Sequence, residues 1–402
     1  MGVSELSPET LVIGAGSTGS SIAYHMKKRG MNATLVDMYG IAGGNTGKSS
    51  GLVRTHYSDE TVARMSKYSL EILRNFSDIG YSGYTETGMI YAFQEADIKS
   101  EKNNMEMLKG LGIGISEMNV KDLSSFYSPV NCGNFDFISY EPRSGYADPV
   151  ATSNSFTAKA KEMGATVNIN KKAVKIEKAG SKTRVYFSDG KNADFDRVVL
   201  ATNIWTNRLL LNSGVQQNEL MPIWATRHNV IYLRRPKSYT GIKPVLWDMA
   251  QLSYYKMEGE SLTAIGSLDP ERDKTQTDPE EEVFNEATDE YLEEYLGKIS
   301  ARLPDMKDAT LVSAVSGKYD MTPDGEPIMD KLSHLDLGNV YLCAGLSGHG
   351  FKLSPAIGNM VADMVQGKNP NDCMFDWRKF NWKRFKDGKL IGRSHQNIGT
   401  LY

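Results

Sequence analysis

The 402-residue sequence has few cysteines, no excess of basic charge and no long apolar run. Its three cysteines, Cys132, Cys343 and Cys373, are odd in number and far apart. They fit neither a disulfide framework nor a metal site, and they favour a reducing compartment such as the cytoplasm. The formal net charge of −3 and the absence of basic blocks argue against nucleic-acid binding. No apolar stretch approaches the roughly 20 residues of a transmembrane helix, so we expect no transmembrane segment.

The strongest pattern present is a strand–turn–helix–strand unit at residues 10–37. The apolar run 11–13 predicts a buried parallel strand, which breaks at the glycine-rich turn 14–19. A helical pattern follows, and a second strand at 33–36 ends on Asp37. Because the unit begins so close to the first residue, we expect no secretory signal before it.

The residue types in this unit suit a dinucleotide. Gly14 allows the tight turn, Gly16 lets the backbone approach a pyrophosphate, and Gly19 lets the helix pack closely on the sheet. The helix N-terminus then faces the phosphates. Asp37 stands where a carboxylate accepts hydrogen bonds from the adenosine ribose. A chance glycine-rich turn is the alternative, but it does not account for the flanking strands and the acid.

The loop at 38–51 is the second glycine-rich segment. It also contains Thr46, Ser49 and Ser50, and this composition suits a backbone that wraps a ligand and donates hydrogen bonds. A flexible surface loop is the alternative interpretation.

A third glycine-rich segment, 345–350, follows a predicted strand near the C-terminus. We expect the next helix to begin near Ser354 and Pro355, since serine caps helices and proline is common in their first turn. His349 lies between glycines, so we expect a geometric or hydrogen-bonding role for it rather than that of a base. Lys352 lies beside the turn, where a cation can hold an anionic substrate; an ordinary solvated lysine is the alternative.

The order of predicted elements indicates an α/β fold with two interleaved domains. A Rossmann-like dinucleotide-binding domain is predicted from residues 1–80, 145–215 and 321–402. A substrate domain with an antiparallel sheet is predicted from residues 81–144 and 216–320, where charged and aromatic residues mix on the strands. A charged helix is expected from about 279 to 303, with Glu280, Glu281 and Glu282 in its first turn.

Six motifs in chain order carry a resemblance that covers about residues 10–370. They are VIGAGSTGSSIAYHMKKRG, GGNTGKSSGLVR, GYADP, VVLATNIWTN, YDMTPDGEPI and CAGLSGHGFKLSPAIG. Together they resemble the FAD-dependent amine and amino-acid oxidoreductases of the D-amino-acid oxidase superfamily. The subgroup includes sarcosine oxidase, glycine oxidase, dimethylglycine dehydrogenase and the β subunit of dye-linked proline dehydrogenase.

The resemblance implies an extended FAD with its pyrophosphate at the first glycine-rich turn and its flavin between the other two glycine-rich segments. The residues that it implies as FAD contacts are Gly14, Gly16, Ser17, Thr18, Gly19, Asp37, Met38, Thr46, Lys48, Ser49, Ser50, Gly51, Val174, Thr202, Trp205, Gly345, Ser347, Gly348, His349, Gly350, Phe351 and Lys352.

The resemblance also implies a substrate site. Arg54 and Lys352 fall on the positions of the arginine and the lysine that hold the substrate carboxylate in sarcosine-oxidase-like enzymes. Two cations from separate segments suit a carboxylate better than either alone. Tyr57 and Tyr319 match aromatic residues of that pocket.

Three positions depart from the family pattern. The cysteine that bears the covalent flavin in monomeric sarcosine oxidases falls on Gly317, and the flavin-bearing histidine of dimethylglycine dehydrogenases falls on Lys48. We therefore expect FAD to be bound non-covalently. The lysine that helps sarcosine oxidases react with oxygen falls near Ala264, so a dehydrogenase with another electron acceptor is as plausible as an oxidase.

The resulting hypothesis is an FAD enzyme that oxidises the C–N bond of a small amino acid, such as sarcosine, glycine, proline or another N-substituted amino acid. One alternative is a related enzyme with another substrate, such as glycerol-3-phosphate. Another is a non-catalytic flavoprotein subunit or assembly factor, and a third is an NAD-dependent dehydrogenase. Assembly as a homo-oligomer or as a subunit of a larger dehydrogenase is compatible with the sequence.

Overall fold

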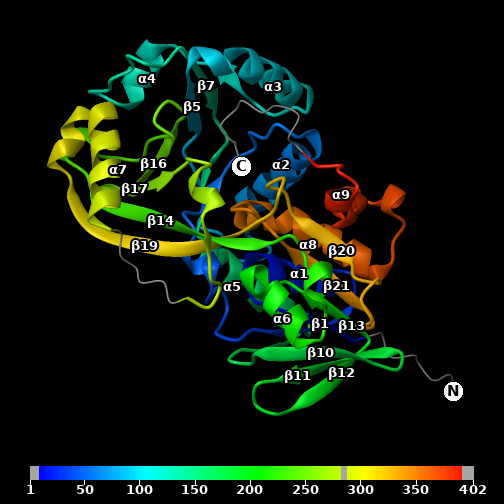
Figure 1. Ribbon diagram of the computed structural model, residues 1–402. Coiled ribbons are helices and arrows are strands. Elements are labelled where there is room, and N and C mark those ends of the chain that lie inside the picture. The colour runs from blue at the N-terminus through cyan, green and yellow to red at the C-terminus, as the bar shows by residue number, and fades with distance from the viewer. Residues whose placement is uncertain (1–8, 282–287, 392–402) are drawn as a thin grey trace.

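The protein is described here by a computed structural model covering residues 9–281 and 288–391. Two large sheets organise it, one of six strands and one of nine (Figure 1). No helix in these two ranges is long and apolar enough to cross a membrane.

The six-stranded sheet has the order β20-β21-β13-β1-β2-β9 and is parallel except for β20 at its edge. Its strands are β1 (Glu9–Ile13), β2 (Asn32–Val36), β9 (Thr166–Asn168), β13 (Arg197–Leu200), β20 (Ile328–Lys331) and β21 (Val340–Ala344). Helix α1 (Ser17–Lys28) joins β1 to β2, so the predicted strand–turn–helix–strand unit is confirmed.

Both faces of this sheet are covered, which explains why its inner strands β1, β13 and β21 are mainly apolar and buried. Helices α1, α5 (Pro149–Glu162) and α8 (Gly350–Gln366) pack together on one face. A three-stranded meander, β10 (Ala173–Ala179), β11 (Lys182–Phe187) and β12 (Asn192–Phe195), covers the other. The α/β class and the Rossmann-like arrangement are therefore confirmed.

The nine-stranded sheet has the order β18-β14-β17-β16-β15-β5-β7-β6. Strands β18 and β17 pair with different parts of β14, and β19 pairs along the whole length of β14. Its strands are β5 (Met89–Phe93), β6 (Ser116–Glu117), β7 (Phe137–Glu141), β14 (Trp224–Arg234), β15 (Val245–Asp248), β16 (Ser253–Glu258), β17 (Leu262–Ser267), β18 (Gln276–Thr277) and β19 (Thr310–Met321). The long β14 and β19 run together across the middle of Figure 1. The expectation of a purely antiparallel sheet is wrong at one place: β5 and β15 pair in parallel. These strands come from separate segments of the chain, so no hairpin imposes opposite directions.

Alternation along β16 gives the nine-stranded sheet two different faces. Tyr255 and Met257 pack on the side of α7 (Asp289–Arg302), whereas Tyr254 packs in the core shared with α1 and α8. The face with Tyr254 also carries Tyr91 and Trp247, and these side chains pack in the same core cluster as Tyr57 of the candidate site. The predicted domain boundaries stay a prediction.

Two predicted helix starts are wrong. Helix α8 begins at Gly350, one turn before Ser354, and Pro355 lies inside it. Helix α7 begins at Asp289 because Thr288 caps it by accepting a hydrogen bond from the Tyr291 amide at 3.3 Å. Glu280 and Glu281 therefore precede the helix, and Glu282 lies outside the described residues.

Candidate active site

A groove of about 470 Å³ runs along the carboxyl-terminal edge of the parallel sheet, where ligands bind in such folds. Among the residues expected to contact FAD or substrate, those that line it are Gly14, Gly16, Ser17, Thr18, Gly19, Asp37, Met38, Thr46, Ser49, Val174, Thr202, Trp205, Tyr319, Gly348, Gly350 and Phe351.

The first glycine-rich turn has the geometry that a pyrophosphate requires. Gly14 has a φ of 108°, and a Cβ there would lie 2.2 Å from the Ala201 carbonyl oxygen. A Cβ on Gly19 would lie 1.8 Å from the Gly14 carbonyl oxygen. Helix α1 begins after Gly16, which has no side chain to cap it, and the Ser17 amide donates to Thr46 Oγ1 at 3.1 Å. The buried Thr18 hydroxyl has no hydrogen-bond partner in the described structure, and this donor at a helix N-terminus fits a phosphate group of FAD.

Asp37 lines the groove at the end of β2 and also holds the turn in place. Its Oδ2 accepts a hydrogen bond from the Ala15 amide at 2.7 Å, and its Oδ1 accepts from the amides of Tyr39 and Gly40 at 2.8 and 3.0 Å. The carboxylate therefore lies in a fixed orientation beside the groove.

The expected residues that do not line the groove are Lys48, Ser50, Gly51, Arg54, Tyr57, Gly345, Ser347, His349 and Lys352. Lys48 packs on Gly317, and the Ser50 carbonyl accepts a hydrogen bond from Lys256 Nζ at 2.7 Å. Lys256 is also the cross-strand partner of Ala264, so a buried lysine lies next to that residue. Gly51 packs on Ala147.

The third glycine-rich segment is built against the end of β19. A Cβ on Gly345 would lie 2.4 Å from Thr322 Cγ2, and Ser347 Oγ accepts a hydrogen bond from the Thr322 amide at 3.2 Å. A Cβ on Gly348 would lie 2.8 Å from the Tyr319 ring. This contact brings Tyr319 to the groove, where its ring stacks on His228 at 3.7 Å.

Arg54 forms the centre of a buried polar cluster. It has no exposed surface, and Nη1 donates to the His56 carbonyl oxygen. Its Cζ lies 4.1 Å from the centroid of the Tyr57 ring and 5.1 Å from that of Trp247. Nε and Nη2 have no hydrogen-bond partner in the described structure. The aromatic rings thus cover the guanidinium, while one donor edge is left for a ligand.

Lys352 and His349 lie close enough to Arg54 to respond to its charge. Burial, followed by the charge of Arg54, holds the pKa of Lys352 well below its usual value. Burial also holds the pKa of His349 well below its usual value, and its ring lies 5.3 Å from that of Tyr57. Lys352 Nζ donates to the Gly348 carbonyl oxygen at 3.2 Å. The fold therefore brings Arg54, Tyr57, His349 and Lys352 together.

The sequence interpretation missed other residues of the site. Asp320 lines the groove, and burial raises the pKa of its carboxyl group to about 6. Asn45, Asn203 and Lys318 also line the groove, and Trp247 covers Arg54. Asp320 lies within the YDMTPDGEPI motif, which offered a signal, whereas nothing near Trp247 in the sequence did.

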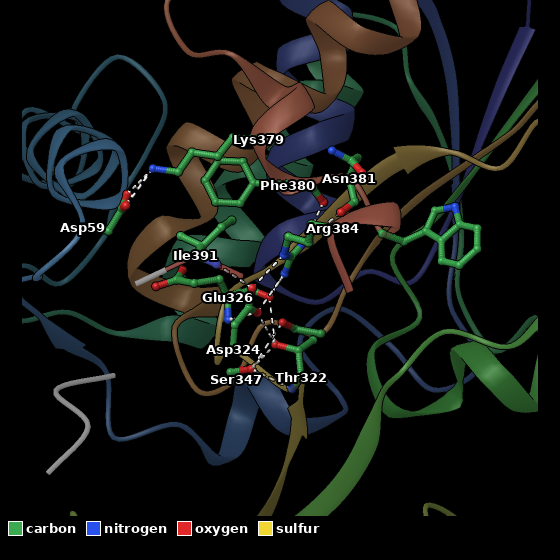
Figure 2. A network of polar contacts seen from close by, with 12 residues as sticks. Asp59, Thr322, Asp324, Glu326, Ser347, Lys379, Phe380, Asn381, Arg384 and Ile391 are labelled. Atoms are coloured by element: carbon green, nitrogen blue, oxygen red, sulfur yellow. Dashed lines mark hydrogen bonds and ion pairs between the residues drawn. The ribbon is translucent and has the colours of Figure 1, made fainter. Parts of the chain in front are cut away.

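The C-terminal segment contacts both the residues after β19 and the start of the helix that follows Arg54 (Figure 2). Arg384 forms a two-pronged ion pair with Asp324 at 2.8 and 3.0 Å. The Asp324 carboxylate also accepts from Thr322 at 3.3 Å, and Thr322 contacts Ser347. Lys379 binds the carboxylate of Asp59, the N-cap of helix α2 (Glu60–Arg74) that follows the Arg54 segment, at 2.7 and 2.8 Å.

Comparisons with known proteins agree with this geometry. The chain is 24% identical to human peroxisomal sarcosine oxidase over 96% of its own length and 98% of that protein. It is 23% identical to a 4-methylaminobutanoate oxidase from Paenarthrobacter nicotinovorans, over 98% of its own length but only 48% of that longer protein. The fold is shared with L-proline dehydrogenase from P. horikoshii, with a TM-score of 0.84, 24% identity, and coverage of 96% of this chain and 99% of that one. The family described as FAD dependent oxidoreductase matches residues 9–364, and the chain therefore belongs to that family.

Proposed function

We propose that this protein oxidises the C–N bond of a small amino acid or N-substituted amino acid to an imine, with Arg54 and Lys352 holding the substrate carboxylate. Sarcosine, glycine and proline are representative substrates. The relatives support an amino-acid substrate because their names include sarcosine, L-proline and 4-methylaminobutanoate, each of which carries a carboxylate.

The observation that carries the proposal is the unpaired edge of the buried Arg54 guanidinium. A buried cation without a counterion is costly, and none of the ion pairs between described residues involves Arg54. A carboxylate that binds Nε and Nη2 side by side supplies both the missing charge and two acceptors. Lys352 adds a second cation from another segment.

FAD, when bound, supplies the acceptor for a hydride equivalent from the carbon next to the amine nitrogen. The chain's own contribution is to orient and to shield the substrate. Arg54 and Lys352 fix the carboxylate, and thereby the position of the neighbouring C–N bond. Tyr57, Trp247 and Tyr254 are buried and keep water away from that carboxylate. No side chain is assigned as a general base.

The proposal also covers how FAD is attached and in which cellular compartment the enzyme works. We propose that FAD is bound non-covalently, since Gly317 and Lys48 offer no thiol or imidazole for a flavin bond. A reducing compartment such as the cytoplasm is supported by three cysteines that form no disulfide.

A panel of amines tests the reaction. Under anaerobic conditions, sarcosine, glycine, L-proline and other N-methyl amino acids are mixed with the FAD-loaded protein, and the flavin absorbance band is followed. We expect some members to bleach it and their neutral amides to fail, because only the acids can bind Arg54. Bleaching by glycerol-3-phosphate alone would favour the related enzyme with another substrate. Bleaching by no member would favour the non-catalytic subunit.

Ligand binding is expected to depend on pH through Lys352. Its pKa is lowered in the free site, and a bound carboxylate favours the ammonium form, so binding takes up a proton. Affinity for acetate should therefore be full below the free-site pKa of Lys352 and should fall as pH rises above it, by up to about tenfold per pH unit. Lys352→Met should flatten this profile. A wild-type affinity that rises with pH would contradict the assignment.

A further inference from the structure

Arg54 lies in a buried segment with little regular structure of its own. Residues 54–57 connect β3 (Leu52–Val53) to α2, are fully or almost fully buried, and belong to neither a helix nor a strand. Such a segment needs side-chain partners for its orientation, because no sheet ladder or helical hydrogen bonding imposes one. The residues that supply these partners therefore control where the Arg54 guanidinium points.

Glu141, at the end of β7, holds the residue after Arg54. Its side chain is 1% exposed, and its Oε1 accepts hydrogen bonds from the Thr55 amide at 2.9 Å and from the Thr55 hydroxyl. Its Oε2 accepts from the Tyr91 hydroxyl at 2.9 Å. A buried carboxylate of this kind is stable only while its donors are present.

Glu101, on helix α3 (Ile98–Gly110), holds the next residue. It is 2% exposed, and its two oxygens lie 3.0 and 2.9 Å from His56 Nε2. Ser139 Oγ donates to the same carboxylate at 2.8 Å. The His56 ring also stacks on Tyr91 at 4.2 Å, so its orientation is fixed from two sides.

The chain of contacts ends on the guanidinium itself. Arg54 Nη1 donates to the carbonyl oxygen of His56, the residue that Glu101 holds, while Thr55 between them is held by Glu141. With Nη1 fixed in this way, the planar guanidinium presents Nε and Nη2 in one direction. If residues 54–57 needed only to be packed in place, apolar side chains could do this without the cost of burying two carboxylates.

We propose that Glu141 and Glu101 are positioning residues, which orient the Arg54 guanidinium for its carboxylate ligand through Thr55 and His56. This inference rests on the proposed function. Both acids come from the 81–144 segment, so this part of the chain shapes the substrate site without contacting the substrate.

The test measures acetate binding to the FAD-loaded protein through the change in flavin absorbance, with neutral acetamide as the ligand control. Glu141→Leu removes all three acceptor contacts and should raise the acetate Kd by about tenfold to a hundredfold. Glu141→Gln keeps an acceptor oxygen for Thr55 and should restore the Kd to within about threefold of wild type. Thr55→Val removes one contact without burying a new charge, so it provides a second measurement if Glu141→Leu does not fold.

A matched control separates orientation from stability. Asp363 is also buried, at 4% exposure, and pairs with Arg29 at 2.9 Å and Lys368 at 2.7 Å at the far end of α8. Asp363→Asn should destabilise the fold and leave the acetate Kd unchanged. If the wild type binds acetate and Glu141→Leu, Thr55→Val and Glu101→Leu all bind it equally well, the positioning role is refuted. If the wild type itself shows no acetate binding, the proposed carboxylate site is refuted and this inference with it.

Discussion

Replacing Arg54 by alanine is expected to weaken carboxylate binding by about 2–5 kcal/mol, or about 30-fold to several thousandfold in Kd. We expect a large loss because the guanidinium is fully buried and its open edge has two donors that a carboxylate can bind. Arg54→Lys should recover only part of it, since an ammonium is a point charge and cannot present two parallel donors. Acetate titration of the FAD-loaded variants measures both effects.

Arg235 offers a matched control for this experiment. It is also a buried arginine, 5% exposed, and its nitrogens donate to the carbonyl oxygens of Tyr239, Leu262, Gly241 and Gly259. Arg235→Lys should lower the free energy of unfolding without changing the acetate Kd. An Arg54→Ala protein that retains FAD and binds acetate as tightly as the wild type would remove Arg54 from the proposed substrate site.

Gly14→Ala is expected to abolish FAD retention. The added Cβ would meet the Ala201 carbonyl oxygen at 2.2 Å, and the φ of 108° is one that alanine avoids. Either β1 must move away from β13 or the turn must open, and both changes displace the amides that face the pyrophosphate. We expect the free energy of unfolding to fall by at least about 3 kcal/mol. Acid precipitation, which should release all FAD from the wild type into the supernatant, measures the flavin content.

Gly30→Ala is a control variant, because it adds backbone strain without the steric clash that Gly14→Ala produces. Gly30 also has a positive φ, 71°, but nothing lies within 4 Å of the position of its Cβ. This substitution should cost about 1–2 kcal/mol of stability and leave the FAD content unchanged. A Gly14→Ala protein that holds a full complement of FAD would contradict the assignment of this turn to the pyrophosphate.

Local patterns predicted most of the elements because their signals are local. The apolar run at 11–13 and the second strand at 33–36 can be recognised within a short window, and both are strands of the structure. Helix starts were less reliable, since Ser354 and Pro355 resemble a first turn whether or not another turn precedes them. The sequence interpretation did not include β19, whose residues 310–313 are exposed at a sheet edge and lack an apolar pattern.

The sequence alone determined the dinucleotide fold, because a glycine that needs positive φ and a strand that ends on an acid are properties of neighbouring residues. It also gave the family, through six motifs in order. Only the tertiary structure decided how Arg54 is set up for a ligand. The Trp247 ring over its face, the carboxylates behind Thr55 and His56, and the lysine that responds to its charge come from β15, β7, α3 and α8. Such contacts depend on how distant elements pack, and no local pattern in the chain records them.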